Sequence, residues 1–145
     1  MLGVDPGSLR IGIAISDGTG TLARPLSILK HISRQQDAQK IAMIASENNC
    51  DTIVVGTPLD SEGNIGPRAR ASLKLIDAIR ALTALSVVPW DESGSSMKVY
   101  EIKSAMNLSR KQRPQPIDDQ AAAIILSDYL DHHPLEERIE HESKS

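Results

Sequence analysis

The sequence predicts one three-layer α/β domain, with helices flanking a mixed five-stranded sheet. Its 145 residues suit a single domain. Its hydrophobic pattern changes from alternation in the first thirty residues to helical periodicity and short apolar runs afterwards. With 40% hydrophobic and 24% charged residues, the composition excludes disordered and fibrous classes. A strand meander followed by alternating helices and strands is typical of helices packed on a sheet.

Three consecutive strands are predicted at the start of the chain. Leu2–Asp5 is a short apolar run, closed by the turn-forming residues Pro6-Gly7-Ser8. Ile11–Asp17 alternates apolar and small residues, so it should return beside the first strand as a hairpin. Ala23–Leu29 would add a third strand. Pro25 within it fits an edge position or a strand end, because proline cannot donate to the ladder.

Helices and strands alternate in the rest of the chain. Apolar residues at i, i+3, i+4 and i+7 predict amphipathic helices, and β-branched runs predict buried strands. The predicted elements are helix Ser33–Asn49, strand Thr52–Val55, a helix opening at Gly66-Pro67, strand Ser86–Trp90, helix Ser96–Met106 and helix Ile117–Leu130. We therefore expect one domain over residues 1–131 and an acidic, flexible tail over residues 132–145.

Composition also limits the cellular setting and the partners. A single cysteine, Cys50, allows no intrachain disulfide, and no secretion signal precedes the first strand, so a cytoplasmic protein is expected. The longest apolar run, Ala121–Leu126, is too short to span a membrane, so no membrane partner is expected. One Trp, two Tyr and no Phe disfavour folds that bind nucleic acid by stacking bases.

Charge is distributed unevenly along the chain. The net charge is −3, so no overall basic field points to nucleic acid. The segment from Lys98 to Arg113 nevertheless holds five cations against the single acid Glu101, while the C-terminal tail is acidic. Such a segment is more often a solvated face than a binding site. It remains a candidate for contacts to phosphates.

Three acidic residues are candidates for metal chemistry. Asp5 and Glu92 follow predicted strands, where α/β sheets build their sites, and Asp118 opens the last helix. Each has a structural alternative. Asp5 would then be part of a strand-ending turn, Glu92 would lie in a solvated loop, and Asp118 would complement the helix dipole. Asp118 is favoured over Asp119, because its spacing to the apolar residues that follow places it on the face towards the sheet.

Clustered carboxylates suit hard divalent cations, since they repel one another unless a cation lies between them. Two such ions about 3.5–4 Å apart can activate water and stabilise the leaving oxygen in phosphodiester cleavage. The candidate metal is therefore Mg²⁺ or Mn²⁺. The candidate phosphate contacts are Arg10, Arg68, Lys98, Arg110, Lys111 and Arg113.

Four blocks of the sequence resemble the YqgF/RuvX family. They are Asp5–Asp17, Val54–Leu59 together with Gly63 and Gly66–Ala69, Asp91-Glu92, and Ile117–Leu126. The resemblance spans Leu2 to about Leu130 and implies a ribonuclease-H-like fold related to the RuvC resolvases. It implies a nuclease that matures the 5′ end of pre-16S rRNA or resolves branched DNA. It also implies that Asp5, Glu92 and Asp118 are the catalytic, metal-binding acids.

One segment departs from the family pattern. Where the family usually has arginine after Asp-Glu, this chain continues with Ser93–Ser96, so a phosphate clamp or a structural ion pair is missing. A noncatalytic nucleic-acid-binding or assembly module therefore stays open. A phosphotransferase is a third reading, because Asp5–Ser8 also resembles the phosphate loop of sugar kinases and actin-like ATPases. Those enzymes close two such domains around a nucleotide, whereas 145 residues supply one. Whether the chain forms a homodimer is also open.

Overall fold

The structure, a computed structural model, describes residues 1–17, 22–60, 62–91 and 118–132, and of residues 118 and 119 the backbone alone. The predicted helix Ser96–Met106 and the tail beyond residue 132 lie outside the described residues. The described elements are β1 (Leu2–Pro6), β2 (Arg10–Ser16), β3 (Ala23–Lys30), α1 (Arg34–Glu47), β4 (Thr52–Gly56), α2 (Pro67–Arg80), β5 (Ser86–Trp90) and α4 (Asp118–His132).

The predicted mixed five-stranded sheet is confirmed. Its strand order is β3-β2-β1-β4-β5. β1, β2 and β3 form an antiparallel meander, whereas β4 and β5 run parallel to β1, each reached through a helix. Pro25 lies in the edge strand β3, opposite Ala14 and beside a shift in the register, where a missing N–H donor is tolerated.

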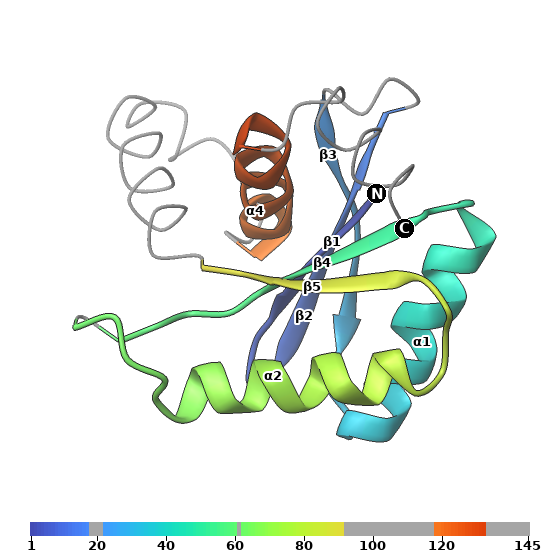
Figure 1. Cartoon of the computed structure of the whole chain (residues 1–145). Coiled ribbons are helices and arrows are strands. Elements are labelled where there is room, and N and C mark those ends of the chain that lie inside the picture. The colour runs from blue at the N-terminus through green and yellow to red at the C-terminus, as the bar shows by residue number, and fades with distance from the viewer. Residues whose placement is uncertain (18–21, 61, 92–117, 133–145) are drawn as a thin grey trace.

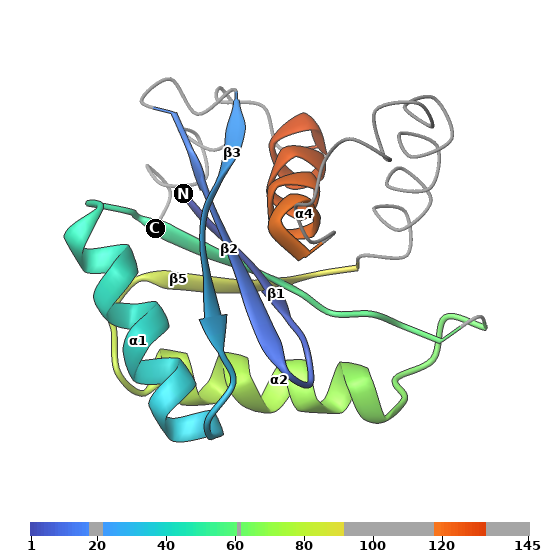
Figure 2. The same ribbon diagram turned by 180° about the vertical axis from the view of Figure 1, so that it is seen from behind.

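The sheet lies between two helical layers. α1 and α2 cover one face and α4 covers the other (Figures 1 and 2). Alternation along β1 sends Leu2 and Val4 into the core under α1 and α2, where they are fully buried. Gly3 and Asp5 consequently point to the face that α4 covers. This alternation decides on which side of the sheet a site built on Asp5 must lie.

Gly3 is the point at which α4 comes closest to β1. A Cβ atom added at Gly3 would lie 2.8 Å from Leu126 Cβ and 2.9 Å from the Ala122 carbonyl oxygen. Ala122 and Leu126 are themselves fully buried in the second core cluster, with Val54 of β4. The absence of a side chain at residue 3 and the small side chain at residue 122 therefore let the helix lie directly on the strand.

Local signals decide where the first two helices begin. The predicted start at Ser33 is the N-cap of α1, where the Ser33 hydroxyl oxygen accepts a hydrogen bond of 3.2 Å from the Gln36 N–H. α2 begins at Pro67, directly after the Gly66 cap, which agrees with the prediction. In the described part of the chain, no helix has the length and apolar character needed to cross a membrane.

Candidate active site

Asp5 lies where β1 separates from its parallel neighbour. The pairing of β1 with β4 ends at Val4 and Val55, while the pairing with β2 continues through Asp5 and Gly12. The Asp5 side chain is half-buried on the α4 side of the sheet. Strand ends at which the topology changes are the usual place for sites in open α/β sheets. Asp5 therefore lies within β1, paired with Gly12, at the kind of strand end where such sites are built, and its role as a site residue stays a prediction.

The start of α4 lies near the end of β1. Gly3 of β1 lies against Ala122 of α4. Asp118 precedes Ala122 by one helical turn, and Asp5 follows Gly3 by two residues along β1. Figures 1 and 2 show the orange end of α4, where the helix begins, next to β1 in both views. The backbone at Asp118 is thus placed close to the strand end that carries Asp5. The Asp118 side chain lies outside the described residues.

β5 brings the chain to the same end of the sheet as β1. Its last residue, Trp90, pairs with Gly56 of β4, and exposed Asp91 follows. The Trp90 indole donates a hydrogen bond of 2.7 Å to the Asp128 carboxylate, and its ring meets Tyr129 edge to face at 5.4 Å. These contacts attach the end of β5 to α4. Glu92, two residues after Trp90, lies outside the described residues.

The turn that joins β1 to β2 requires glycine at residue 7. The Gly7 N–H donates to the Arg10 carbonyl oxygen at 2.9 Å, and a Cβ atom on Gly7 would lie only 2.4 Å from that oxygen. The turn therefore holds Ser8 and Arg10 in a tight loop directly after Asp5. Both side chains are exposed.

The predicted site residues are only partly within the described chain. Arg10 opens β2 and Arg68 lies in the first turn of α2, and both are exposed. Lys98, Arg110, Lys111, Arg113 and the loop Ser93–Ser96 lie outside the described residues. No group of three metal-ligating side chains occurs within residues 1–17, 22–60, 62–91 and 120–132, a range that excludes Glu92 and the Asp118 side chain. The acidic triad therefore stays a prediction.

Sequence reasoning missed a second group of polar residues, at the start of α1. Asp37 is buried and accepts hydrogen bonds from the His31 ring and from the Ile32 N–H. Asp37 shares a helix face with the core residues Ile41 and Ala45, at i+4 and i+8. A carboxylate on the apolar face of an amphipathic helix is the signal that could have identified this group.

Burial disfavours the reactive thiolate form of Cys50. Cys50 is buried directly before β4, and this burial raises the pKa of its thiol. We expect iodoacetamide to alkylate Cys50 on the order of tenfold more slowly in the native protein than in urea, as followed by mass spectrometry. The native rate should still rise above about pH 9, where an exposed thiol is already mostly ionised. Equal rates in the native and unfolded states would contradict the burial of Cys50.

Comparison with known proteins assigns the chain to a family. A family model described as "RuvX: Holliday junction resolvase" matches residues 1–132. The chain belongs to the RuvX family. Among the relatives of this RuvX protein, one from Geobacillus kaustophilus is 39% identical, and one from Bacillus cytotoxicus is 37% identical. Each alignment covers 90% of this chain, and 96% and 97% of the relative, respectively; both relatives carry the name "Putative pre-16S rRNA nuclease".

The ribonuclease-H-like fold expected for a RuvX protein is confirmed by a solved structure. The chain is similar to T. thermophilus RuvC in complex with a Holliday junction substrate, with a TM-score of 0.60 and 14% sequence identity. The match covers 92% of this chain and 95% of that chain. At this identity the likeness establishes the fold alone, including its three-layer arrangement of helices around a mixed sheet.

Proposed function

We propose that this RuvX-family protein is a metal-dependent endonuclease that hydrolyses phosphodiester bonds in structured nucleic acid. The position of Asp5 carries the proposal, because it sets a half-buried carboxylate at the end of β1, on the face to which α4 brings the backbone of Asp118. The names of the relatives at 37–39% identity favour RNA, namely the 5′ end of pre-16S rRNA, over branched DNA. Branched DNA is kept as an outcome of the test.

Carboxylates of Asp5, Glu92 and Asp118 would hold Mg²⁺ or Mn²⁺. An oxygen-only donor set suits these hard cations. When bound, the ion supplies a water of lowered pKa and stabilises charge on the leaving oxygen. The described part of the chain contributes rigidity: Asp5 is held in the sheet by pairing with Gly12, and the contact between Gly3 and Ala122 fixes α4 against β1. Such support is what a site needs to keep its ligands in place.

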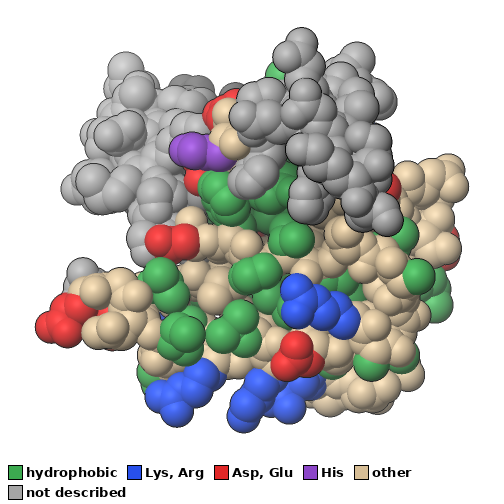
Figure 3. Space-filling model, in the orientation of Figure 1, with side chains coloured by type: hydrophobic (Ala, Val, Ile, Leu, Met, Phe, Trp, Pro, Cys, Tyr) green, Lys and Arg blue, Asp and Glu red, His purple; other side chains and the backbone are tan. Residues whose placement is uncertain are grey.

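Exposed cations along α2 are candidates to position the substrate. Along α2, the basic side chains Arg68, Arg70, Lys74 and Arg80 are exposed, with Asp77 among them. Figure 3 shows blue side chains gathered along the lower edge of the molecule, over α2. Contacts of this kind bind phosphates without reading sequence. Arg80 already donates to the Val87 carbonyl oxygen at 2.6 Å, so Arg68, Arg70 and Lys74 are the α2 cations left to contact a strand. They lie on the face opposite α4, while Arg10 lies just after the turn that follows Asp5.

The test is a cleavage assay with two substrates. Purified protein is incubated with a 5′-extended 16S rRNA precursor or a four-way DNA junction, in Mg²⁺, Mn²⁺ or EDTA. We expect cleavage of the RNA only with metal, and Asp5→Asn should slow it by about 100-fold or more, a loss of roughly 2.7 kcal/mol of transition-state stabilisation. Asp51→Asn, an exposed aspartate preceding β4, is the matched control and should leave the rate unchanged.

The same assay separates the alternatives. Cleavage of the junction alone would transfer the proposal to branched DNA. Binding of either substrate without cleavage in any metal would support the noncatalytic module that the altered loop Ser93–Ser96 leaves open. Metal-dependent cleavage that survives Asp5→Asn would contradict the proposed site. Submicromolar binding of ATP by the isolated chain would favour a phosphotransferase instead.

A further inference from the structure

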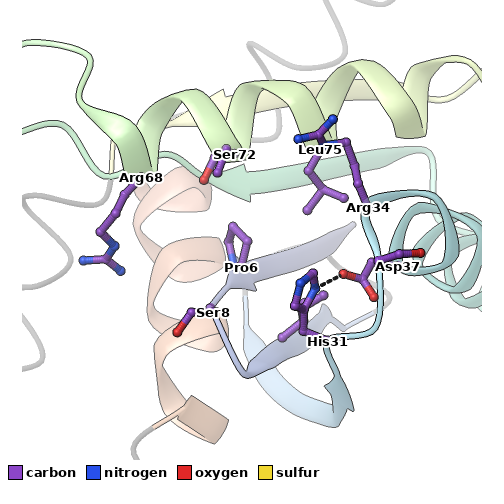
Figure 4. Close-up of a pocket in the computed structure, with 12 residues that line it drawn as sticks. Pro6, Ser8, His31, Arg34, Asp37, Arg68, Ser72 and Leu75 are labelled. Carbon is purple, nitrogen blue, oxygen red and sulfur yellow. Dashed lines mark hydrogen bonds and ion pairs between the residues drawn. The ribbon is translucent and has the colours of Figure 1, made fainter.

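A pocket opens on the face of the sheet opposite to α4. Its volume is about 560 Å³, and it lies between the β1–β2 turn, the start of α1 and the first turns of α2 (Figure 4). Asp5 points to the other face of β1, so this pocket is separate from the candidate active site. A volume of this size is in the range of small-molecule sites, about 300–1,000 Å³.

Two arginines flank the opening of the pocket. Figure 4 shows Arg34, from the first turn of α1, and Arg68, from the first turn of α2, on opposite sides of it. Both are exposed, and neither forms an ion pair with a residue in the described part of the chain. Arginine suits the recognition of phosphate, because its planar donors can bind two oxygens at once. The pocket therefore has two cationic groups available for an anion.

Ser72 provides an unpartnered hydroxyl inside the pocket. Its exposed fraction is 2%, and Figure 4 shows it on α2, facing the space between the helices. Its hydroxyl makes no hydrogen bond to any described residue. A buried hydroxyl without a partner costs free energy, so such groups usually bind a ligand or water. Ser72 thus gives the pocket a buried polar group that a ligand or a water would satisfy.

The one acidic side chain that lines the pocket is already engaged. Asp37, whose side chain is 3% exposed, accepts hydrogen bonds from the Ile32 N–H at 3.1 Å and from the His31 ring through Nδ1. With Nδ1 held in this way, the second nitrogen of His31 is left as a donor or acceptor for a ligand. Asp37 therefore orients His31 within the pocket.

The remaining wall of the pocket is apolar. Pro6, Ile11, Ala71 and Leu75 line it beneath the charged opening. A polar, cationic opening above an apolar wall matches a molecule with a phosphate at one end and a sugar and base at the other. We propose that the pocket binds a nucleoside 5′-monophosphate unit, with its phosphate between Arg34 and Arg68, within reach of His31 and Ser72, and its nucleoside against the apolar wall.

The proposal goes beyond the proposed nuclease function and does not depend on it. The unit could be a free nucleotide or the 5′-phosphorylated end of a strand. Isothermal titration with AMP, in EDTA, tests the shared chemistry, and we expect binding in the micromolar to millimolar range. Adenosine without phosphate should bind at least about tenfold more weakly. Asp5→Asn should leave AMP binding unchanged, so failure of the nuclease proposal and failure of this one are distinguishable.

Substitutions in the pocket test the geometry. Arg34→Gln and Arg68→Gln should each weaken AMP binding by about tenfold, as expected for loss of a charge-assisted hydrogen bond. Arg24→Gln, an exposed arginine of β3 outside the pocket, is the control and should change it less than twofold. Ser72→Ala should weaken binding while leaving the thermal midpoint equal or higher, because it removes an unpartnered buried hydroxyl. This last variant separates a ligand contact from a structural role.

Two competitors then identify the source of the nucleotide. Displacement of AMP by a 5′-phosphorylated RNA oligonucleotide, and not by its 5′-hydroxyl form, would assign the pocket to a strand end. If neither oligonucleotide displaces AMP, the pocket is assigned to a free nucleotide. Either assignment supports the pocket as a nucleotide site. No binding of AMP at millimolar concentration would overturn the proposal, as would binding that Arg34→Gln and Arg68→Gln leave unchanged.

Discussion

Gly3→Ala is expected to lower the free energy of unfolding by about 2–3 kcal/mol, the cost of overpacking a closely packed contact. The added Cβ atom would meet Leu126 Cβ at 2.8 Å and the Ala122 carbonyl oxygen at 2.9 Å. The second neighbour is backbone, which cannot rotate away, so α4 must shift from β1. Urea denaturation followed by circular dichroism measures the change. Displacement of α4 should also move the backbone at Asp118 and slow cleavage.

Gly66→Ala is the matched control for Gly3→Ala. Gly66 is the N-cap of α2, where no side chain caps the helix by a hydrogen bond. A Cβ atom added at Gly66 would meet nothing within 4 Å. Its replacement should cost less than about 1 kcal/mol, the usual difference between glycine and alanine at an N-cap. If Gly3→Ala proved as stable as the parent protein, the close approach of α4 to β1 would be wrong.

Saturating Mn²⁺ is expected to raise the thermal midpoint by several degrees near neutral pH. A ligand that binds only the folded protein adds about 2.7 kcal/mol at a hundredfold excess over its Kd. For a chain of this size, each kcal/mol shifts the midpoint by roughly 3–5 °C. Without metal, the proposed carboxylates repel one another, so Asp5→Asn should raise the midpoint in EDTA and reduce the response to Mn²⁺. Differential scanning calorimetry measures both effects.

Acid and a control variant test the origin of the metal effect. Metal affinity and carboxylate repulsion both require ionised carboxylates, so both effects should shrink as acid protonates them. Asp51→Asn should respond to Mn²⁺ as the parent protein does. An Asp5→Asn variant that is less stable than the parent, with no Mn²⁺ shift in either protein, would exclude a carboxylate cluster at the end of β1.

Local sequence patterns predicted the described elements and their order. Alternation in Ile11–Asp17 predicted the returning strand, and the N-cap Ser33 and the first-turn Pro67 marked the starts of two helices. Pro25 indicated an edge strand and was found in one. These features follow from local rules, because turn chemistry, capping and hydrophobic period act within a few residues of the chain.

Packing between distant elements sets which residues lie together across the sheet. Three contacts depend on residues far apart in the chain. Gly3 lies against Ala122, the Trp90 indole donates a hydrogen bond to Asp128, and Arg34 and Arg68 flank one pocket. Asp5 was a candidate from the sequence because it closes a predicted strand. The pocket was not predicted, because its lining comes from three elements whose packing no local pattern specifies. Burial and contact across elements arise only when the helices settle on the two faces of the sheet.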